Sequence, residues 1–291
     1  MATYDNAYEM VDEVRHSLNE HSEALVQGQA KGTHSNNQIL KAINKAQLLI
    51  HAFLFKRDNG LFLTDADLTG VNSVYTLPSN FAKLALFRDE TGRKVFPIVP
   101  SQTKRTAATG SDRLYLRKGN TLVLDKAGVT ETYKLWYYTK PRDIHLGRLD
   151  AGAAQSMTLD DRFGKAIDDY YNGMMIEIMT GTKFIDTITD YTGSSRVAVV
   201  AGTGVKGSFY GLVSELPQPF HSLIPLKAAI HIKATSPVAQ EKPTQVEINE
   251  FGDLLQATVA NYVTDAEDID YEEIFADFEP QVPPFGVISA E

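Results

Sequence analysis

Apolar side chains recur every three or four positions in two segments near the N-terminus, a spacing that predicts amphipathic helices. The first helix is expected over residues 5–27 and the second over about 36–56. A polar stretch that contains glycine, GQAKGTHSNNQ, separates the two helices, and Asn59-Gly60 ends the second. The predicted apolar stripes are Ala7, Val11, Val14, Leu18 and Leu25 in the first helix, and Ile39, Ile43, Ala46, Ile50 and Phe53 in the second.

The pattern changes between residues 61 and 140, where short runs rich in β-branched and aromatic side chains replace the helical spacing. Turn-forming pairs such as Thr91-Gly92 and Gly119-Asn120 separate these runs. The segment is therefore predicted to form a small antiparallel β region of about four to six strands.

A third helix is predicted from Thr158 to Gly181, with Thr158 and Asp161 in a capping-box arrangement and Gly181 as the C-terminal cap. Its apolar stripe would consist of Leu159, Phe163, Ile167, Tyr170, Met174 and Ile178. Residues 184–214 return to strand-like runs, and two last helices are expected at about 219–235 and 243–263.

This order of elements lacks the regular strand–helix alternation of a parallel α/β fold. We therefore predict an α+β, mainly helical fold: a helical bundle with inserted small antiparallel β regions and a C-terminal tail. The expected parts are an N-terminal helical arm (1–34), a helical body (35–182 plus 218–263) with a β region at about 61–140, a β insertion (183–217) and an acidic tail (264–291).

The charge of the chain is concentrated at its C-terminus. Residues 264–291 hold nine of the 37 acidic residues and no Lys or Arg, so 28 acidic and 28 basic residues remain in residues 1–263. A balanced body argues against a protein whose main task is to grip nucleic-acid phosphates, which requires clustered cations. The acidic tail suits contact with a basic protein surface, or solvation alone.

Known catalytic and metal-binding motifs are not found. The chain has no Cys, which excludes disulfides and Cys-ligated metals, and its seven His residues form no metal-binding spacing. Gly202, Gly204 and Gly207 match G-x-G-x-x-G, but a strand-like run follows where a dinucleotide site needs a helix. The tail fails as a calcium loop because Glu273 stands where Gly is required. We expect no cofactor, no metal and no catalytic residues, although a general acid–base enzyme stays open.

Two further features bear on partners. No apolar run is long enough to span a bilayer, and acidic residues near the N-terminus argue against a signal peptide. We therefore expect no membrane partner. A basic loop could contact DNA or an acidic partner, or could simply be a solvated hairpin edge. Its charged residues are Lys104, Arg105, Arg113, Arg117 and Lys118.

The order of several segments resembles the head-to-tail adaptor (connector) proteins of tailed bacteriophages. The segments are ILKAINKAQLLIHAFLF, SVYTLPSNFAKLALFRDETGRKVFPIVP, YLRKGNTLVLDKAGVTETYKLWYYTKPRDI, RFGKAIDDYYNGMMIEIMTG, ITDYTGSSRVAVVAG and FYGLVSELPQPFHSLIPLKAAIHI. The resemblance covers about residues 35–263, with Leu77-Pro78 and Leu216-Pro217 as its sharpest points.

The resemblance implies a structural virion protein that is not an enzyme. It would form a ring, usually of about twelve copies, that docks under the portal protein, extends the DNA channel and presents an attachment surface to tail (nozzle or tube) proteins. Double-stranded DNA would only pass through the lumen. The protein would be made in the cytoplasm of the host bacterium and end at the head–tail junction of the virion. The alternatives are another tail component, such as a tail-completion or tube protein, and a polysaccharide hydrolase.

The acidic tail is the expected portal-docking segment. Tyr271, Ile274, Phe275 and Phe278 follow helical spacing and would form one apolar face, with Phe285 as a further anchor. Two other surfaces are expected to make contacts. The β insertion at 184–214 would contact a tail protein or a neighbouring subunit. The helices at about 159–180 and 243–263 would supply core and subunit contacts, with Met174, Met175 and Met179 at one helix end.

Overall fold

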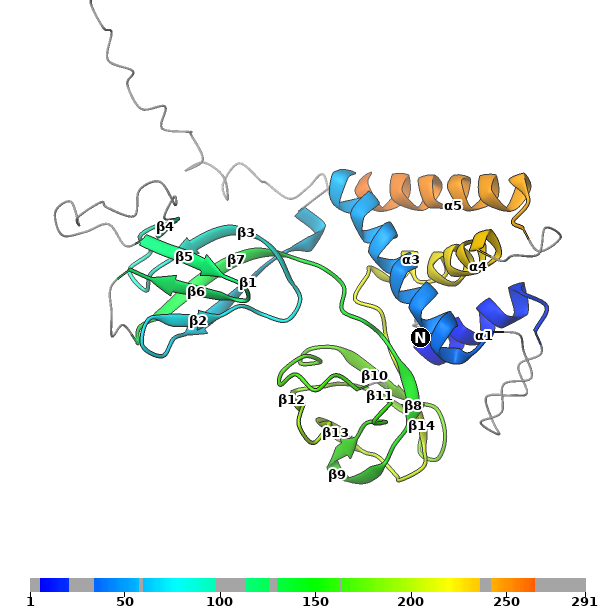
Figure 1. The fold of residues 1–291 in the computed structure, drawn as a ribbon, viewed down its shortest axis with the longest axis horizontal. Coiled ribbons are helices and arrows are strands. Elements are labelled where there is room, and N and C mark those ends of the chain that lie inside the picture. The colour runs from blue at the N-terminus through cyan, green and yellow to red at the C-terminus, as the bar shows by residue number, and fades with distance from the viewer. Residues whose placement is uncertain are drawn as a thin grey trace, which may run out of the picture.

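The chain folds into a helical unit and two β units that extend from it in different directions (Figure 1). The structure is a computed structural model that describes residues 6–20, 34–57, 60–97, 114–125, 130–162, 164–235 and 242–264. The helices come from both ends of the described chain, and both β units come from its middle.

The helical unit is built around one apolar helix. Its members are α1 (Ala7–Ser17), α3 (Asn36–Arg57), α4 (Leu223–Thr235) and α5 (Gln245–Thr264). α4 packs against α1, α3 and α5 and buries Ile224, Ala228 and Ile232. A helix that is apolar nearly all round must be enclosed by other elements, which explains its central place. α1 begins with a capping box, in which Asn6 accepts hydrogen bonds from the N–H groups of Tyr8 and Glu9.

The first β unit consists of two sheets with a core of their own. Its strands are β1 (Leu63–Thr69), β2 (Val74–Thr76), β3 (Phe81–Arg88), β4 (Phe96–Pro97), β5 (Leu114–Lys118), β6 (Thr121–Leu124) and β7 (Thr132–Thr139). One sheet has the order β1-β7-β3 and the other β2-β6-β5-β4. Tyr75, Phe87 and Tyr133 contact one another between the sheets, with ring centroids 5.0 to 6.2 Å apart. The 3-10 helix η1 (Gly60–Phe62) joins α3 to β1.

The second β unit shares its core with the helices. Its strands are β8 (Leu146–Arg148), β9 (Ala151–Thr158), β10 (Met175–Ile178), β11 (Phe184–Thr187), β12 (Asp190–Thr192), β13 (Val197–Thr203) and β14 (Phe209–Leu212). The sheets have the orders β11-β10-β14-β8 and β12-β13-β9. Side chains from these strands and from all four described helices belong to one buried cluster. A second 3-10 helix, η3 (Gln218–Phe220), leads into α4.

The prediction of a mainly helical bundle is wrong. The described chain forms four sheets beside its helices, and the helices make up only one of its three units. The sequence pattern correctly placed α3, α4, α5 and a β region between residues 61 and 140. Within the described residues, that region has seven strands in two sheets, where four to six were predicted, and β4 pairs with β5 in parallel and not antiparallel. The error lies in the middle of the chain, where β pairing replaces an expected helix.

The helix predicted from Thr158 to Gly181 does not form. Thr158 ends β9, residues 164–174 form turns, and Met175–Ile178 form β10 between β11 and β14. Asp169 and Gly173 adopt positive φ angles of 59° and 82°, which an α-helix cannot accommodate. The strands at 184–212 pair with β8, β9 and β10, so the predicted insertion at 183–217 is one part of the second β unit.

Two other expectations concern the ends of the chain and the membrane. The first helix is shorter than predicted, since α1 ends at Ser17, and residues 21–33 lie outside the described part. The tail at 265–291 lies outside it as well. Among the described helices, none combines the length and the apolar character that a membrane span requires.

Candidate interaction surfaces of the helical unit

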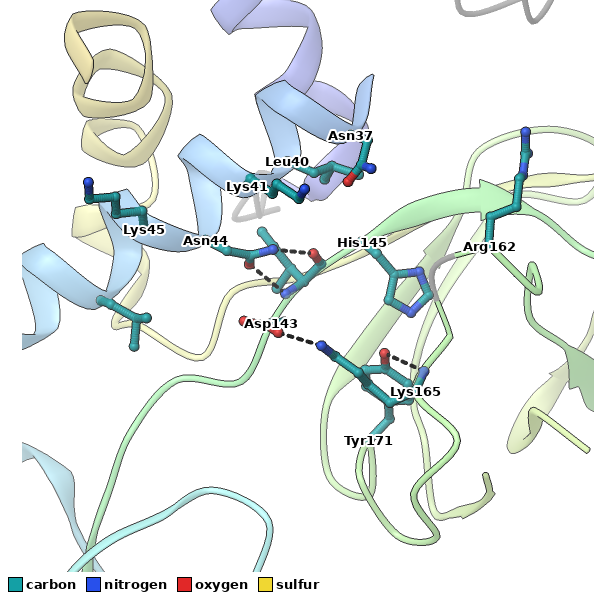
Figure 2. Close-up of a pocket in the computed structure, with 12 residues that line it drawn as sticks. Asn37, Leu40, Lys41, Asn44, Lys45, Asp143, His145, Arg162, Lys165 and Tyr171 are labelled. Atoms are coloured by element: carbon teal, nitrogen blue, oxygen red, sulfur yellow. Dashed lines mark hydrogen bonds and ion pairs between the residues drawn. The ribbon is translucent and has the colours of Figure 1, made fainter. Parts of the chain in front are cut away.

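A cleft of about 470 Å³ lies between α3 and the second β unit (Figure 2). The segment that links β7 to β8 forms its floor, and α3 forms one wall. The lining residues are Asn37, Leu40, Lys41, Asn44, Lys45, Leu48, Asp143, Ile144, His145, Arg162, Lys165 and Tyr171.

Polar side chains on one side of α3 hold this linking segment in place. Asn44 makes two hydrogen bonds to Ile144: its side-chain amide donates to the carbonyl at 3.0 Å, and its Oδ1 accepts from the N–H at 2.8 Å. One turn later, Gln47 Nε2 donates to the Arg142 carbonyl at 2.8 Å. His51 Nε2 lies 2.9 Å from the Thr139 carbonyl. The spacing of these three side chains puts them on one face of the helix, so α3 fixes the linker over its full length.

The floor of the cleft contains a buried histidine that is held neutral. His145 is 4% exposed, and its Nδ1 lies 3.2 Å from the Tyr210 hydroxyl. Burial lowers the pKa of His145 to about 3, against which the nearby Asp160 carboxylate acts only in part. Burial also raises the pKa of Tyr210 well above its ordinary value. Neither group can exchange a proton with a substrate near neutral pH.

On the side of the cleft opposite α3, the charged groups are used in ion pairs. Lys165 Nζ lies 2.7 Å from Asp143 Oδ2, and this hydrogen bond raises the pKa of Lys165. Arg162 contacts both carboxylate oxygens of Asp160, at 2.6 and 2.9 Å. Burial alone would raise the pKa of Asp160, but the hydrogen bonds from Arg162 hold it below its ordinary value. The pairs favour the charged forms of Asp160, Arg162 and Lys165, which suits a structural role better than acid–base chemistry.

A second cleft, of about 420 Å³, lies on the other side of the same lysines, between α3 and α4. Lys45 Nζ lies 3.3 Å from His231 Nε2. Burial and then the charges of Lys45 and Lys227 lower the pKa of His231, so its ring is neutral at neutral pH. Lys41 and Lys45 therefore form a ridge between the two clefts. Within the described residues, neither lysine forms an ion pair.

The outward side of α3 carries this ridge as part of a longer stripe, which we call the α3 face. It consists of Lys41, Lys45, Leu48, Ala52 and Lys56, all exposed. The spacing of four, three, four and four residues keeps them on one side of a helix. Leu48 is 41% exposed and the neighbouring Leu49 is 46% exposed, so the face combines positive charge with apolar surface.

The outward side of α5 carries the opposite charge, and we call it the α5 face. It consists of Val246, Glu250, Asp253 and Ala257, all exposed, with the same spacing of four, three and four residues. Val246 is 73% exposed, and Leu254 at the edge of the face is 41% exposed. Glu247 instead turns toward α4, where it pairs with Lys233. In the described part of the chain, Glu250 and Asp253 form no ion pair.

Most of the residues that the sequence analysis predicted to contact partners lie outside the described residues. The predicted portal-docking residues, Tyr271, Ile274, Phe275, Phe278 and Phe285, lie outside the described residues. Lys104, Arg105 and Arg113 of the basic loop lie outside them too, whereas Arg117 and Lys118 end β5.

The methionines predicted at a helix end occupy the second β unit instead. Met174 is buried in the shared core at 1% exposure, and Met175 and Met179 are half-buried in and beside β10. The G-x-G-x-x-G run joins β13 to β14, so a strand follows Gly207 as the sequence predicts.

Sequence reasoning missed the α3 face, the α5 face and the polar side of α3. The signal for the polar side was present, because Asn44, Gln47 and His51 interrupt an otherwise apolar helix at helical spacing. Within the described chain, no three His, Asp or Glu side chains are grouped to hold a metal ion. No family model matches the chain, and no curated protein is significantly similar to it.

Proposed function

We propose that this protein is a structural component of a bacteriophage virion, a head-to-tail adaptor that assembles as a ring under the portal. The ring would extend the DNA channel and provide the surface to which tail proteins attach. The ordered set of segments between residues 35 and 263 that resembles this family is the basis of the proposal. The proposed place of the protein is the head–tail junction, after synthesis in the host cytoplasm.

One structural observation supports an assembly role over a catalytic one. On the side of the larger cleft opposite α3, the charged groups are held in ion pairs, Lys165 with Asp143 and Arg162 with Asp160. By contrast, the charged side chains of the α3 face and the α5 face form no ion pair in the described chain, and exposed apolar side chains lie beside them. Exposed apolar side chains can mark a surface that contacts another protein, and the charges beside them can select the partner.

The proposed ring would meet DNA without holding it. Residues 1–263 contain equal numbers of acidic and basic residues, 28 of each, which argues against tight phosphate binding. A channel protein must let the genome pass, so weak, salt-sensitive contact with duplex DNA is the expected behaviour. The acidic tail with Tyr271, Ile274, Phe275, Phe278 and Phe285 is proposed as the segment that binds the portal protein.

Electron microscopy of the purified full-length protein tests the proposal directly. Negatively stained samples would be imaged alone at increasing concentration and after mixing with portal rings from the same phage. We expect closed rings of the protein, or added density beneath the portal. A compact monomer that never joins portal rings would contradict the adaptor role.

A further inference from the structure

We infer that neighbouring copies of this protein contact each other through the α3 face of one copy and the α5 face of the next. The inference rests on the proposed ring and names the surfaces that would close it. The occupant of each face is thus a second copy of this chain. In this arrangement Lys41 and Lys45 lie opposite Glu250 and Asp253 of the neighbour, with apolar side chains beside them.

The two faces match in both charge and spacing. Along the α3 face the order is lysine, lysine, leucine and alanine, at positions 41, 45, 48 and 52. Along the α5 face it is valine, glutamate, aspartate and alanine, at positions 246, 250, 253 and 257. Both stripes thus pair two charged positions with two apolar ones over about three helical turns. Two such stripes can bring opposite charges and apolar side chains together along the same length of helix.

Most of the described side chains of α5 are exposed or only partly buried. The helix spans 20 residues, yet of its described side chains only Leu255 and Val259 are buried. Phe251 and Tyr262 are partly buried against the same core, and the side facing away from α4 is open. Helices in globular proteins gain most of their stability from packing an apolar face. A second partner on the open side would supply packing that the described residues of one chain do not.

The position of the two faces favours a head-to-tail contact. α3 and α5 both pack on α4, and Figure 1 shows α5 along one edge of the helical unit while α3 crosses it obliquely. Each face is complementary to the other but not to itself, because two α3 faces would bring lysines together and two α5 faces would bring carboxylates together. A symmetric dimer through one face is therefore disfavoured. A heterologous contact repeated by a rotation that closes on itself gives a ring, which is the assembly proposed above.

The charged and the apolar side chains contribute differently to this contact. Exposed ion pairs are individually weak and screened by salt, so the lysines and carboxylates mainly set which faces meet. Leu48, Leu49, Val246 and Leu254 supply apolar surface that is removed from water when the faces join. Assembly should therefore weaken as salt increases, without being abolished.

Charge reversal gives a direct test on the full-length chain. The first variant carries Lys41→Glu and Lys45→Glu, and the second carries Glu250→Lys and Asp253→Lys. Each variant alone presents two faces of like charge, so we expect the concentration needed for half-assembly to increase by about tenfold or more. Mixing the two variants restores opposite charges at every contact. The mixture, and a chain with all four substitutions, should assemble as the wild type does.

Matched controls separate this contact from net charge. Lys83→Glu with Lys118→Glu, and Asp67→Lys with Asp190→Lys, make the same charge changes at exposed positions of the β units. Sedimentation velocity and native mass spectrometry would report the assembly state, and circular dichroism would verify that each variant is folded. The control variants should assemble like the wild type.

The outcomes distinguish the inference from the proposed function. If both face variants assemble normally, the α3–α5 contact is overturned and the adaptor proposal stands. If each variant fails alone and the mixture fails as well, the faces do not meet each other and the inference is again overturned. If the wild type forms no oligomer at any concentration, with or without portal rings, the proposed function falls and the inference falls with it.

Discussion

Arg142 and Glu215 form a bidentate ion pair between the segment that links the two β units and the segment that leads into α4. Arg142 Nη2 lies 2.6 Å from Glu215 Oε1, and Nε lies 3.0 Å from Oε2. The same guanidinium donates to the carbonyls of Tyr170 and Asn172, both at 2.8 Å, and Nη1 lies 3.3 Å from Ser79 Oγ. One side chain thus contacts the first β unit, the second β unit and the approach to the helical unit.

We expect Arg142→Ala to decrease the free energy of unfolding by about 3 kcal/mol, because it removes the guanidinium from the partly buried Glu215 carboxylate and from the Tyr170 and Asn172 carbonyls. The Arg142 N–H still donates to Glu215, and Ser79 Oγ still donates to the Tyr170 carbonyl. Arg142→Lys keeps the charge but cannot form the bidentate geometry, so its effect should be intermediate. Urea unfolding followed by tryptophan fluorescence and circular dichroism would measure both changes. Lys134→Ala is the control, since its ion pair with Asp65 is exposed and should contribute less than about 1 kcal/mol.

Two glycine substitutions should change stability in opposite directions. A Cβ at Gly193 would overlap the backbone of Ile167, which cannot move away as a flexible side chain would. We expect Gly193→Ala to cost about 2 kcal/mol. In the middle of α5, a Cβ at Gly252 meets nothing within 4 Å. Gly252→Ala should therefore stabilise the protein by about 0.5 to 1 kcal/mol through better helix propensity. Equal thermal shifts for the two variants would contradict the packing described for residues 164–174.

The helical unit could be predicted from the sequence because its apolar spacing is long and regular. α3 and α5 lie close to the predicted ranges, and most strands of the first β unit lie in short runs rich in β-branched and aromatic residues. The same criterion wrongly predicted a helix from Thr158 to Gly181. Leu159, Met174 and Ile178 are spaced like a helical stripe, yet their burial comes from turns and from β10 pairing with β11 and β14. Pairing over long sequence distances leaves no local pattern that would reveal it.

The candidate surfaces were harder to predict than the helices that carry them. A lysine or glutamate on the outside of a helix has the same local pattern whether or not it contacts a partner. Which carboxylates are free depends on contacts distant in sequence: Glu247 pairs with Lys233, whereas Glu250 does not. The bonds of Arg142 likewise join residues from 28 to 73 positions apart. Only the folded chain separates paired charges from available ones.

Stability should fall as the pH is lowered toward 5, and His145 should account for much of this decrease. Its pKa is about 3 in the folded chain, below its ordinary value of 6.5. Above about pH 6.5 both states hold a neutral ring, so His145 adds no pH dependence there. Below that value the unfolded chain binds a proton that the folded chain excludes, so stability falls by up to about 1.4 kcal/mol per pH unit. The burial of His51 lowers its pKa as well and acts in the same direction.

The contribution of His145 can be isolated by substitution. His145→Gln removes the titrating group, so the change in melting temperature between about pH 5 and 7 should become smaller than in the wild type. His16→Gln, at an exposed position of α1, is the control for the same substitution without loss of a buried ring. The comparison concerns the slope with pH, so a uniform loss of stability in the His145 variant does not affect it. An unchanged slope in that variant would rule out a buried, neutral His145.

Deletion of residues 265–291 should leave the body folded and remove portal binding. The tail carries eight acidic residues after position 264 besides the C-terminal Glu291, and the described body ends with α5 at Thr264. A segment whose apolar residues follow helical spacing over so short a length is marginal as an isolated helix in water, so it gains most from a partner's groove. Co-sedimentation of the truncated protein with portal rings would measure the loss, and circular dichroism would verify the fold.

Point variants decide whether the apolar face of the tail or its charge is responsible. Phe275→Ser with Phe278→Ser removes two of the predicted anchors and keeps every acidic residue, whereas Glu272→Gln with Glu273→Gln lowers the charge and keeps the anchors. We expect the phenylalanine variant to lose most portal binding, because buried aromatic side chains dominate the energy of such interfaces. The glutamine variant should bind more slowly but nearly as tightly, since rim charges act mainly on the association rate. Full binding by the truncated protein would instead leave the tail without a docking role, and the portal contact would then have to come from the body.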